Sequence, residues 1–369
     1  MILYIFVAAA SVLLGLLVNN CCRVQPNCVT RQQMLNGLCL SAVFLLLFGV
    51  SACRLNVGND YAKYVEFMHL VNCDAFVPTE FGFNQVVKLL YGISGFENYL
   101  LVFAFFAFFT ILFFLYGIYR QADSFPFSFF LFMALGYYFQ SFNTVRYYLA
   151  LAIAVLAIPC VLQRKWMKFL LLVCLGATMH KSILVIFPLY ILASLPWRKW
   201  QLFLAAAFCS TFFFMQDFYL KAVIVLYPTY EDTEYLEGGT SLVNIARCGA
   251  VLILALLCYK KTVKESRRNR FYFYCNLGAL VMYVCCSFLP IISRIGYYLT
   301  ITHIFFLPAL IAGIENEKYR KLVRAGVIFA GVSYFAVFIL MKAGNDGLRI
   351  LPYKTFMFHD MVPILSDVN

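Results

Sequence analysis

Residues 97–119, ENYLLVFAFFAFFTILFFLYGIY, form one of several long apolar runs in this chain. After Glu97 the run carries no charged residue, and a helix of roughly 20 such residues crosses the hydrocarbon core of a bilayer. Of the 369 residues in the chain, 63% are hydrophobic and 12% are charged, and the mean hydropathy is +0.83. Soluble domains carry about 25% charged residues. The composition therefore excludes a water-soluble globular protein.

The apolar runs also decide between the two architectures that can span a membrane. In lipid every backbone N–H and C=O needs an internal partner, which leaves helix bundles and closed β-barrels. The runs here are continuous over roughly 17–22 residues, whereas barrel strands alternate over about ten. We therefore predict an all-α, polytopic integral membrane helix bundle of a single domain, residues 1–369. About twelve transmembrane helices are expected, beginning near Ile2, Met34, Glu97, Phe127, Tyr147, Lys168, Ser182, Gln201, Leu242, Phe271, Ile295 and Leu322.

Basic residues set the expected orientation, because cytoplasmic loops are enriched in Lys and Arg. The first run, from Ile2 to Val18, lacks a positive n-region and a small-residue cleavage site, so we interpret it as a span and not as a leader. With the N- and C-termini outside, the basic cluster at residues 260–270 faces the cytoplasm. The net charge of +12 then describes an inner surface facing anionic lipid and not a nucleic-acid site.

The same orientation leaves three longer segments on the outer side. These are residues 54–96, in which an amphipathic helix is expected to begin at Thr79, residues 216–240, and a tail of residues 342–369. Inner loops are short, so a functional site is expected on the outer face.

Two outer carboxylates are candidate site residues. Asp60, in Gly58-Asn-Asp60-Tyr61, follows the second span and can act as a general base or cap the next helix. Glu80 opens the predicted amphipathic helix, where it is either a favourable N-terminal charge or a carboxylate of a site.

Four cations form the second candidate set, because polar groups at membrane depth are expensive and mark function by default. Arg146 and Arg294 begin the fifth and eleventh spans at the outer side, and Lys181 follows His180 between two short spans. Arg247 lies within a span and needs a partner, either a carboxylate such as Glu237 or a substrate phosphate.

Together these cations favour an anionic ligand such as a lipid diphosphate, for which the arginine fork is well suited. The alternatives are an interfacial arginine that snorkels and a structural histidine. If a diphosphate leaves during the reaction, the cations would stabilise it in place of a metal.

Cysteine usage gives no metal motif. Most of the 14 cysteines lie in apolar runs, where cysteine behaves as a small hydrophobe, and no Cys pair accompanies His at zinc-ligand spacing. Cys53, at the end of the second predicted span, and Cys73 could meet outside the membrane as a disulfide. We predict no metal and no cofactor.

Several of these motifs occur together in one known family. They are Gly58-Asn-Asp60-Tyr61 with Tyr64, Glu80-Phe-Gly82-Phe, the stretch from Arg146 to Pro188 that includes His180-Lys181-Ser182, Arg294-Ile-Gly-Tyr297-Tyr298, and Leu351-Pro352-Tyr353. Over most of its length the chain resembles the EpsG family of polysaccharide polymerases, a branch of the Wzy-type O-antigen and capsule polymerases. The family pattern usually has Gln after the arginine, and this chain has Tyr147.

The resemblance implies a GT-C-like glycosyltransferase that joins undecaprenyl diphosphate-linked repeat units on the outer, periplasmic face of the bacterial inner membrane. It implies that an acceptor hydroxyl attacks the anomeric carbon of the growing chain and that undecaprenyl diphosphate leaves. A chain-length regulator and a flippase are the partners it implies. Carried to this sequence, the expected roles are Asp60 or His180 as base, Arg146, Lys181, Arg294 and Arg247 on the diphosphate, and Tyr61, Glu80 and Tyr297 on the rest of the substrate.

Two other functions remain open from the sequence. A lipid-linked oligosaccharide flippase or other transporter would be expected to have two related halves and a cavity open to both sides. An O-antigen ligase would use similar cations, and the sequence separates it poorly from a polymerase. A membrane acyltransferase fits less well, since it would need a donor path from the cytosol.

Overall fold

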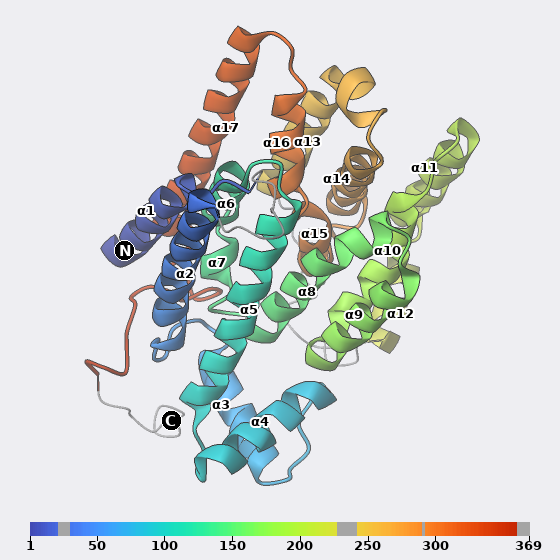
Figure 1. The fold of residues 1–369 in the computed structure, drawn as a ribbon. Helices are drawn as coiled ribbons and strands as arrows, with labels where there is room; N and C mark the ends of the chain where they lie inside the picture. Colours follow the sequence, from blue (N-terminus) through green and yellow to red (C-terminus); the bar gives the residue numbers. More distant parts are fainter. Residues whose placement is uncertain (21–29, 227–241, 290–291, 360–369) are drawn as a thin grey trace. The chain divides into compact units, whose positions relative to one another are not determined.

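The computed structural model describes residues 1–20, 30–226, 242–289 and 292–359. Its regular structure is helical (Figure 1), and among the described residues only an isolated bridge between Arg54 and Thr355 pairs backbone segments in the manner of a sheet. The predicted all-α class is confirmed. The chain groups into two compact units, described one at a time. Unit 1 comprises residues 1–157, 171–183 and 316–369, and unit 2 comprises residues 158–170 and 184–315.

Unit 1 is built around long apolar helices from both ends of the chain. Helix α2 packs along α5, α1 packs on α2 and α6, and α17 also contacts α6. The short helices α3 and α4 pack on each other beside the start of α5. The helices of this unit are α1 (Ile2–Leu16), α2 (Arg31–Ala52), α3 (Tyr61–Asn72), α4 (Phe81–Ser94), α5 (Tyr99–Gln121), α6 (Phe125–Ala134), α7 (Tyr137–Gln140), most of α8 (Val145–Leu162), the end of α9 (Trp166–Met179) and α17 (Glu317–Val337).

Local signals set where several of these helices begin and end. Thr30 caps α2, because its hydroxyl accepts the Gln33 N–H and the Gln33 side chain accepts the Thr30 N–H. Asn98 accepts the Leu101 N–H at 3.0 Å and so caps α5. Gly95 ends α4 in the left-handed conformation, φ +74°, which glycine adopts without strain.

Unit 2 is organised around α14, which contacts α10, α11, α13, α15 and α16. Tyr190 of α10 packs edge-on against Phe271 of α14 at 5.3 Å between ring centroids, and its hydroxyl donates to the Tyr298 carbonyl at 2.7 Å. The helices are α10 (Ile186–Ser194), α11 (Lys199–Phe214), α12 (Gln216–Leu226), α13 (Leu242–Leu257), α14 (Arg267–Cys285), α15 (Ile292–Thr300) and α16 (His303–Ala312).

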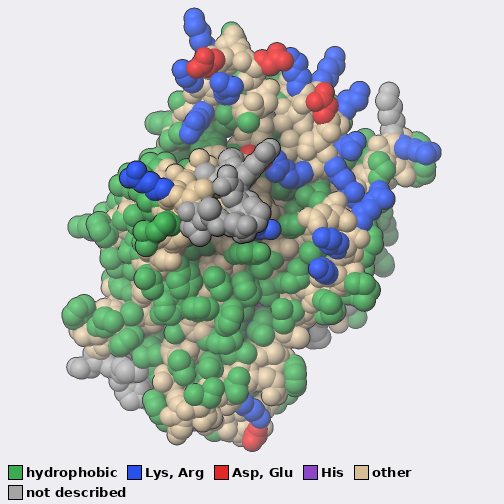
Figure 2. Space-filling model, in the orientation of Figure 1, with side chains coloured by type: hydrophobic (Ala, Val, Ile, Leu, Met, Phe, Trp, Pro, Cys, Tyr) green, Lys and Arg blue, Asp and Glu red, His purple; other side chains and the backbone are tan. Residues whose placement is uncertain are grey.

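Five helical segments are long and apolar enough to cross a membrane, by length and composition: residues 31–52, 99–121, 145–162, 292–312 and 317–342. Shorter apolar helices occupy most of the other runs for which spans are predicted, including residues 2–16, 125–134, 166–179 and 242–257. Figure 2 shows hydrophobic side chains over most of the visible face. A multi-pass membrane protein is confirmed, while the number of about twelve crossings, the outside termini and the GT-C-like arrangement stay predictions.

The predicted outer segments contain further helices. Residues 54–96 hold α3 and α4, and α4 covers the segment in which an amphipathic helix is expected. Helix α12 begins the segment 216–240, whose remainder, with Glu237, lies outside the described residues, as do residues 360–369 of the tail. Cys53 and Cys73 are free thiols in this structure, so the suggested disulfide is not formed.

Candidate functional site

Glu80 is the central carboxylate of the candidate site in unit 1. It occupies the N-cap position of α4, but its side chain makes no capping hydrogen bond. Its Oε2 instead forms an ion pair with the Arg146 guanidinium, and its Oε1 accepts the backbone N–H of Lys181 at 3.0 Å. The Glu80 carboxylate thus joins the start of α4 to α8 and to the segment that follows α9 instead of capping its own helix, and its role in a site stays a prediction.

Arg146 is held by an ion pair and by two aromatic rings. Its side chain is 12% exposed and that of Glu80 is 15% exposed. The guanidinium carbon lies 5.1 Å from the centre of the Phe83 ring and 5.5 Å from that of Tyr64. Aromatic faces attract a cation, and a charge-assisted hydrogen bond is stronger when water is excluded. The arginine is therefore preorganised at the start of α8 and not snorkelling.

A close helix contact brings His180 and Lys181 to this pair. A Cβ built on Gly82 of α4 would lie 2.6 Å from Thr178 Oγ1 and 2.7 Å from the Thr178 carbonyl oxygen, so only glycine allows this approach. Thr178 is in the last turn of α9, two residues before His180. The α9 terminus therefore lies against the start of α4, next to Glu80.

The His180 imidazole has an assignable tautomer. Its Nδ1 accepts the Ser182 N–H at 3.2 Å, which in the neutral ring leaves the proton on Nε2. The ring packs edge-on against Tyr147 with centroids 5.6 Å apart. Tyr147 thus supports the histidine in the position where the family pattern usually has Gln.

The segment that carries Asp60 is anchored to the turn that precedes Arg146. Asn143 Oδ1 accepts the Asp60 N–H at 2.9 Å, and its amide donates to the Gly347 carbonyl at 3.3 Å. Gly58 has φ +107°, and a Cβ there would lie 2.6 Å from the Phe142 carbonyl oxygen. Asp60 is the N-cap residue of α3, yet its side chain makes no capping hydrogen bond. The motif Gly58–Asp60 is thereby attached to Asn143, which lies three residues before Arg146 in the chain.

The C-terminal segment completes this part of unit 1. The backbone N–H groups of Leu55, Gly58 and Asn59 donate to the carbonyls of Lys354, Arg349 and Leu348 at 2.9, 2.9 and 3.0 Å. Residues 348–354, which include the late motif Leu351-Pro352-Tyr353, therefore lie along the loop that leads to Asp60.

Arg54 is a buried cation that the sequence did not mark as a site residue. It is 1% exposed, its guanidinium lies between the rings of Phe103 and Phe142 at 5.1 and 5.2 Å, and Nη1 donates to the Ser51 carbonyl at 2.6 Å. Burial lowers the pKa of Arg54. The signal in the sequence that could have marked Arg54 is its position four residues before Gly58.

Tyr61 has a packing role in this structure. Its side chain is fully buried, and its ring stacks on Phe103 at 4.4 Å between centroids. Burial raises the pKa of its hydroxyl. A contact of Tyr61 with substrate stays a prediction.

The remaining predicted site residues lie in unit 2. Arg294 and Tyr297 are on α15, and Arg247 is on α13. Cys248 follows Arg247 in the chain, and its backbone carbonyl accepts a hydrogen bond from the Asn276 side-chain amide at 3.1 Å. The Oδ1 atom of Asn276 is 2.8 Å from Nε2 of the fully buried His303. Arg146 and Lys181 belong to unit 1, so the idea that all four cations form one set stays a prediction.

The fold and these motifs define a multi-pass helical membrane protein with a mostly buried carboxylate–arginine pair that joins several sequence motifs. The chain belongs to the EpsG family, whose sequence model matches residues 37–355. The match covers most of the chain and every motif named above, and it confirms the resemblance. It places the chain, at the level of the family, among membrane proteins of polysaccharide biosynthesis. No curated protein and no solved structure matches the chain.

Proposed function

We propose that this protein is a membrane polysaccharide polymerase. It joins undecaprenyl diphosphate-linked oligosaccharide repeat units on the outer face of the bacterial inner membrane and releases undecaprenyl diphosphate. The observation that carries the proposal is the Glu80–Arg146 pair with the Lys181 N–H on the same carboxylate. Family membership supports it, because the residues that meet at this pair come from separate motifs of the matched region.

The diphosphate is proposed to bind at Arg146 and Lys181. Glu80 orients the guanidinium through Nη1, and an arginine carries further N–H donors in a fixed fork that can bind phosphate oxygens. The Lys181 ammonium adds a second positive charge. Cations held in place before the reaction stabilise the charge that develops on the leaving diphosphate without a metal ion. Arg294, Arg247 and Tyr297 of unit 2 are proposed as further contacts to the same substrate.

Glycosyl transfer needs one base and one acid or cation. In the proposed step, the oxygen of an acceptor hydroxyl forms a bond to the anomeric carbon of the growing chain. The bond between that carbon and the diphosphate oxygen breaks, and undecaprenyl diphosphate leaves with the electron pair. His180 carries its proton on Nε2 when neutral, so the ring can donate a hydrogen bond to the leaving diphosphate and stabilise its developing charge. Asp60 is then the better candidate for the base that accepts the hydroxyl proton.

The test uses the purified full-length chain in nanodiscs with a synthetic undecaprenyl diphosphate-linked repeat unit from its own locus, without nucleotide or added metal. We expect a ladder of products. Arg146→Ala should lower the rate by about 100-fold or more, because a preorganised donor to a developing charge contributes about that factor. Arg320→Ala is the matched control, since Arg320 is exposed and lies in the first turn of α17.

Other outcomes would redirect the proposal. A ladder that is unchanged by Arg146→Ala would remove Arg146 from the diphosphate site. No ladder, together with transfer of a labelled lipid-linked unit between leaflets of liposomes, would make the protein a flippase. Transfer of a finished chain to a lipid A core acceptor, without lengthening, would make it a ligase.

A further inference from the structure

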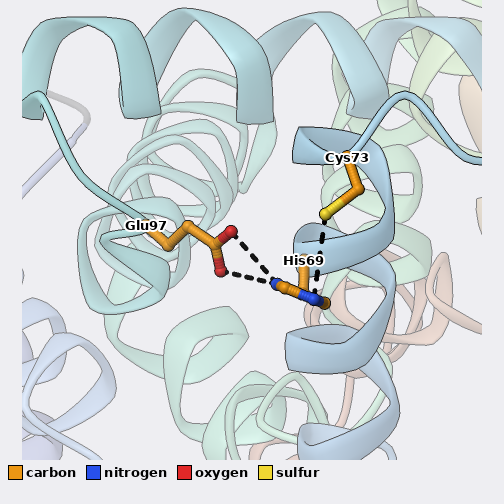
Figure 3. Close-up of side chains that lie close together, drawn as sticks. All are labelled: His69, Cys73 and Glu97. Atoms are coloured by element: carbon orange, nitrogen blue, oxygen red, sulfur yellow. Dashed lines mark hydrogen bonds and ion pairs between the residues drawn. The ribbon is translucent and has the colours of Figure 1, made fainter.

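Three metal-ligating side chains meet on the predicted outer side of unit 1 (Figure 3). His69 and Cys73 are one helical turn apart at the C-terminal end of α3, and Glu97 lies two residues before α5 begins. His69 Nδ1 is 3.1 and 2.9 Å from the two carboxylate oxygens of Glu97, and its Nε2 is 3.8 Å from Cys73 Sγ. One ligand atom from each residue lies within 4.8 Å of the other two.

We propose that His69, Cys73 and Glu97 bind a Zn²⁺ ion, with a water molecule as fourth ligand. Zinc is bound by imidazole nitrogen, thiolate sulfur and carboxylate oxygen at bond lengths of about 2.0–2.3 Å, which separates tetrahedral ligands by roughly 3.3–3.6 Å. The three ligand atoms lie within 4.8 Å of one another, so the side chains would draw together by about 1 Å to reach that spacing. A turn of the imidazole about its Cβ–Cγ bond selects which ring nitrogen coordinates.

The charges and the second contacts of the cluster also suit a divalent ion. A thiolate and a carboxylate neutralise the two charges of the metal, while the imidazole is neutral. Asn72 donates to Glu97 Oε1 at 2.8 Å, so this oxygen stays hydrogen-bonded while Oε2 turns to the metal. A soft thiolate with an imidazole favours zinc over calcium or magnesium, which prefer oxygen ligands.

The site is open to solvent. The side chains of His69 and Glu97 are 46% and 37% exposed, and Cys73 is an exposed free thiol. Asn72 and Glu97 also border a cavity of about 470 Å³ whose wall includes Asp74, Lys88 and Tyr91. A metal ion can therefore enter, and the fourth position is accessible to water.

Zinc at this position would have a structural consequence and no part in glycosyl transfer. It would link the end of α3 to the start of α5, and the chain between these points contains α4 and Glu80. Because zinc would bind only the folded arrangement, the unfolding temperature of the protein would rise with the logarithm of the ligand excess over Kd.

The test titrates Zn²⁺ and then Co²⁺ into metal-stripped, full-length protein in detergent under reducing conditions. We expect one zinc ion per chain and a thiolate-to-cobalt charge-transfer band. Cys73→Ser should abolish that band, and His69→Ala and Glu97→Gln should each weaken zinc binding by about tenfold or more. Cys174→Ser, which changes an exposed cysteine on α9, should leave both unchanged.

Matched unfolding temperatures without metal establish that each variant is folded. Equal zinc affinity in wild type and Cys73→Ser would overturn the site, as would a cobalt spectrum without a thiolate band. In that case the three side chains form a hydrogen-bonded cluster that holds α3 to the Glu97 segment. A metal-bound thiolate and neutral imidazole both compete with protons, so zinc affinity should fall as the pH is lowered.

Discussion

Glu80 and Arg146 form an ion pair, which is stronger where water is excluded. Both side chains are mostly buried, and the carboxylate also accepts the Lys181 N–H. Removing one partner of such a pair leaves an uncompensated charge in a poorly solvated place, which costs more than the pair itself contributes. The pair therefore acts as a constraint on three segments of the chain.

A double-mutant cycle tests this constraint. Glu80→Gln and Arg146→Gln should each lower the free energy of unfolding by about 3 kcal/mol, and the double variant should lose less than the sum by at least about 1 kcal/mol. Unfolding in a denaturing detergent gives the values. The control cycle uses Glu317 and Lys321, an exposed i,i+4 pair whose coupling should be about 0.5 kcal/mol or less. Additive losses at Glu80 and Arg146 would mean that the two side chains are not coupled.

At the scale of elements, the contact between α4 and the end of α9 places Glu80 beside Lys181. This contact depends on Gly82, where a Cβ has no room against Thr178. Helix α4 itself does not need glycine at that position, because glycine lowers helix stability relative to alanine by roughly 1 kcal/mol. The residue is therefore explained by packing between helices and not by the helix.

Two glycines of α4 give a matched comparison. Gly82→Ala should separate α4 from α9, lower the unfolding temperature and reduce polymer formation at least about tenfold, because small displacements of substrate-positioning groups have large effects on rate. Gly92→Ala should leave activity unchanged and raise stability slightly, because nothing lies within 4 Å of its added Cβ. If the two variants behave alike, the close contact does not position the site.

For the whole molecule, the distribution of charge predicts which face meets the cytoplasm. The cluster at residues 260–270 and the start of α17 carry many of the basic residues. The carboxylates discussed above, which are Asp60, Asp74, Glu80 and Glu97, lie in the segments that flank α3 and α4. Cytoplasmic loops are enriched in Lys and Arg, so residues 54–96 should face outward.

Cysteine labelling of intact cells checks this orientation. With a membrane-impermeant maleimide, Phe76→Cys should be labelled, since Phe76 is 91% exposed in the segment between α3 and α4. Lys318→Cys should be labelled only after the membrane is permeabilised. The unsubstituted chain gives the background from native cysteines. The opposite pattern would place the candidate site in the cytoplasm and end the proposal of an outer-face polymerase.

The sequence was sufficient for the class, the helical segments and the family. Long apolar runs without charge can satisfy their backbone in lipid only as helices, and this requirement acts locally along the chain. The motifs around Asp60, Glu80, Arg146 and His180 could also be found in the sequence, because each is a short local pattern. Local patterns could not decide whether Asp60 and Glu80 cap their helices or act in a site, because both roles place a carboxylate at the same position in the sequence.

Tertiary structure decided which of these residues meet. Glu80 pairs with Arg146 across 66 positions and with Lys181 across 101, and Glu97 reaches His69 across 28. The spacing of His69 and Cys73 alone suggested no metal site, because the third ligand comes from another segment. Such contacts depend on how helices approach one another, here through the missing side chain of Gly82 and the loop anchored by Asn143. Sequence periodicity determines which residues can form helices, whereas packing determines their partners.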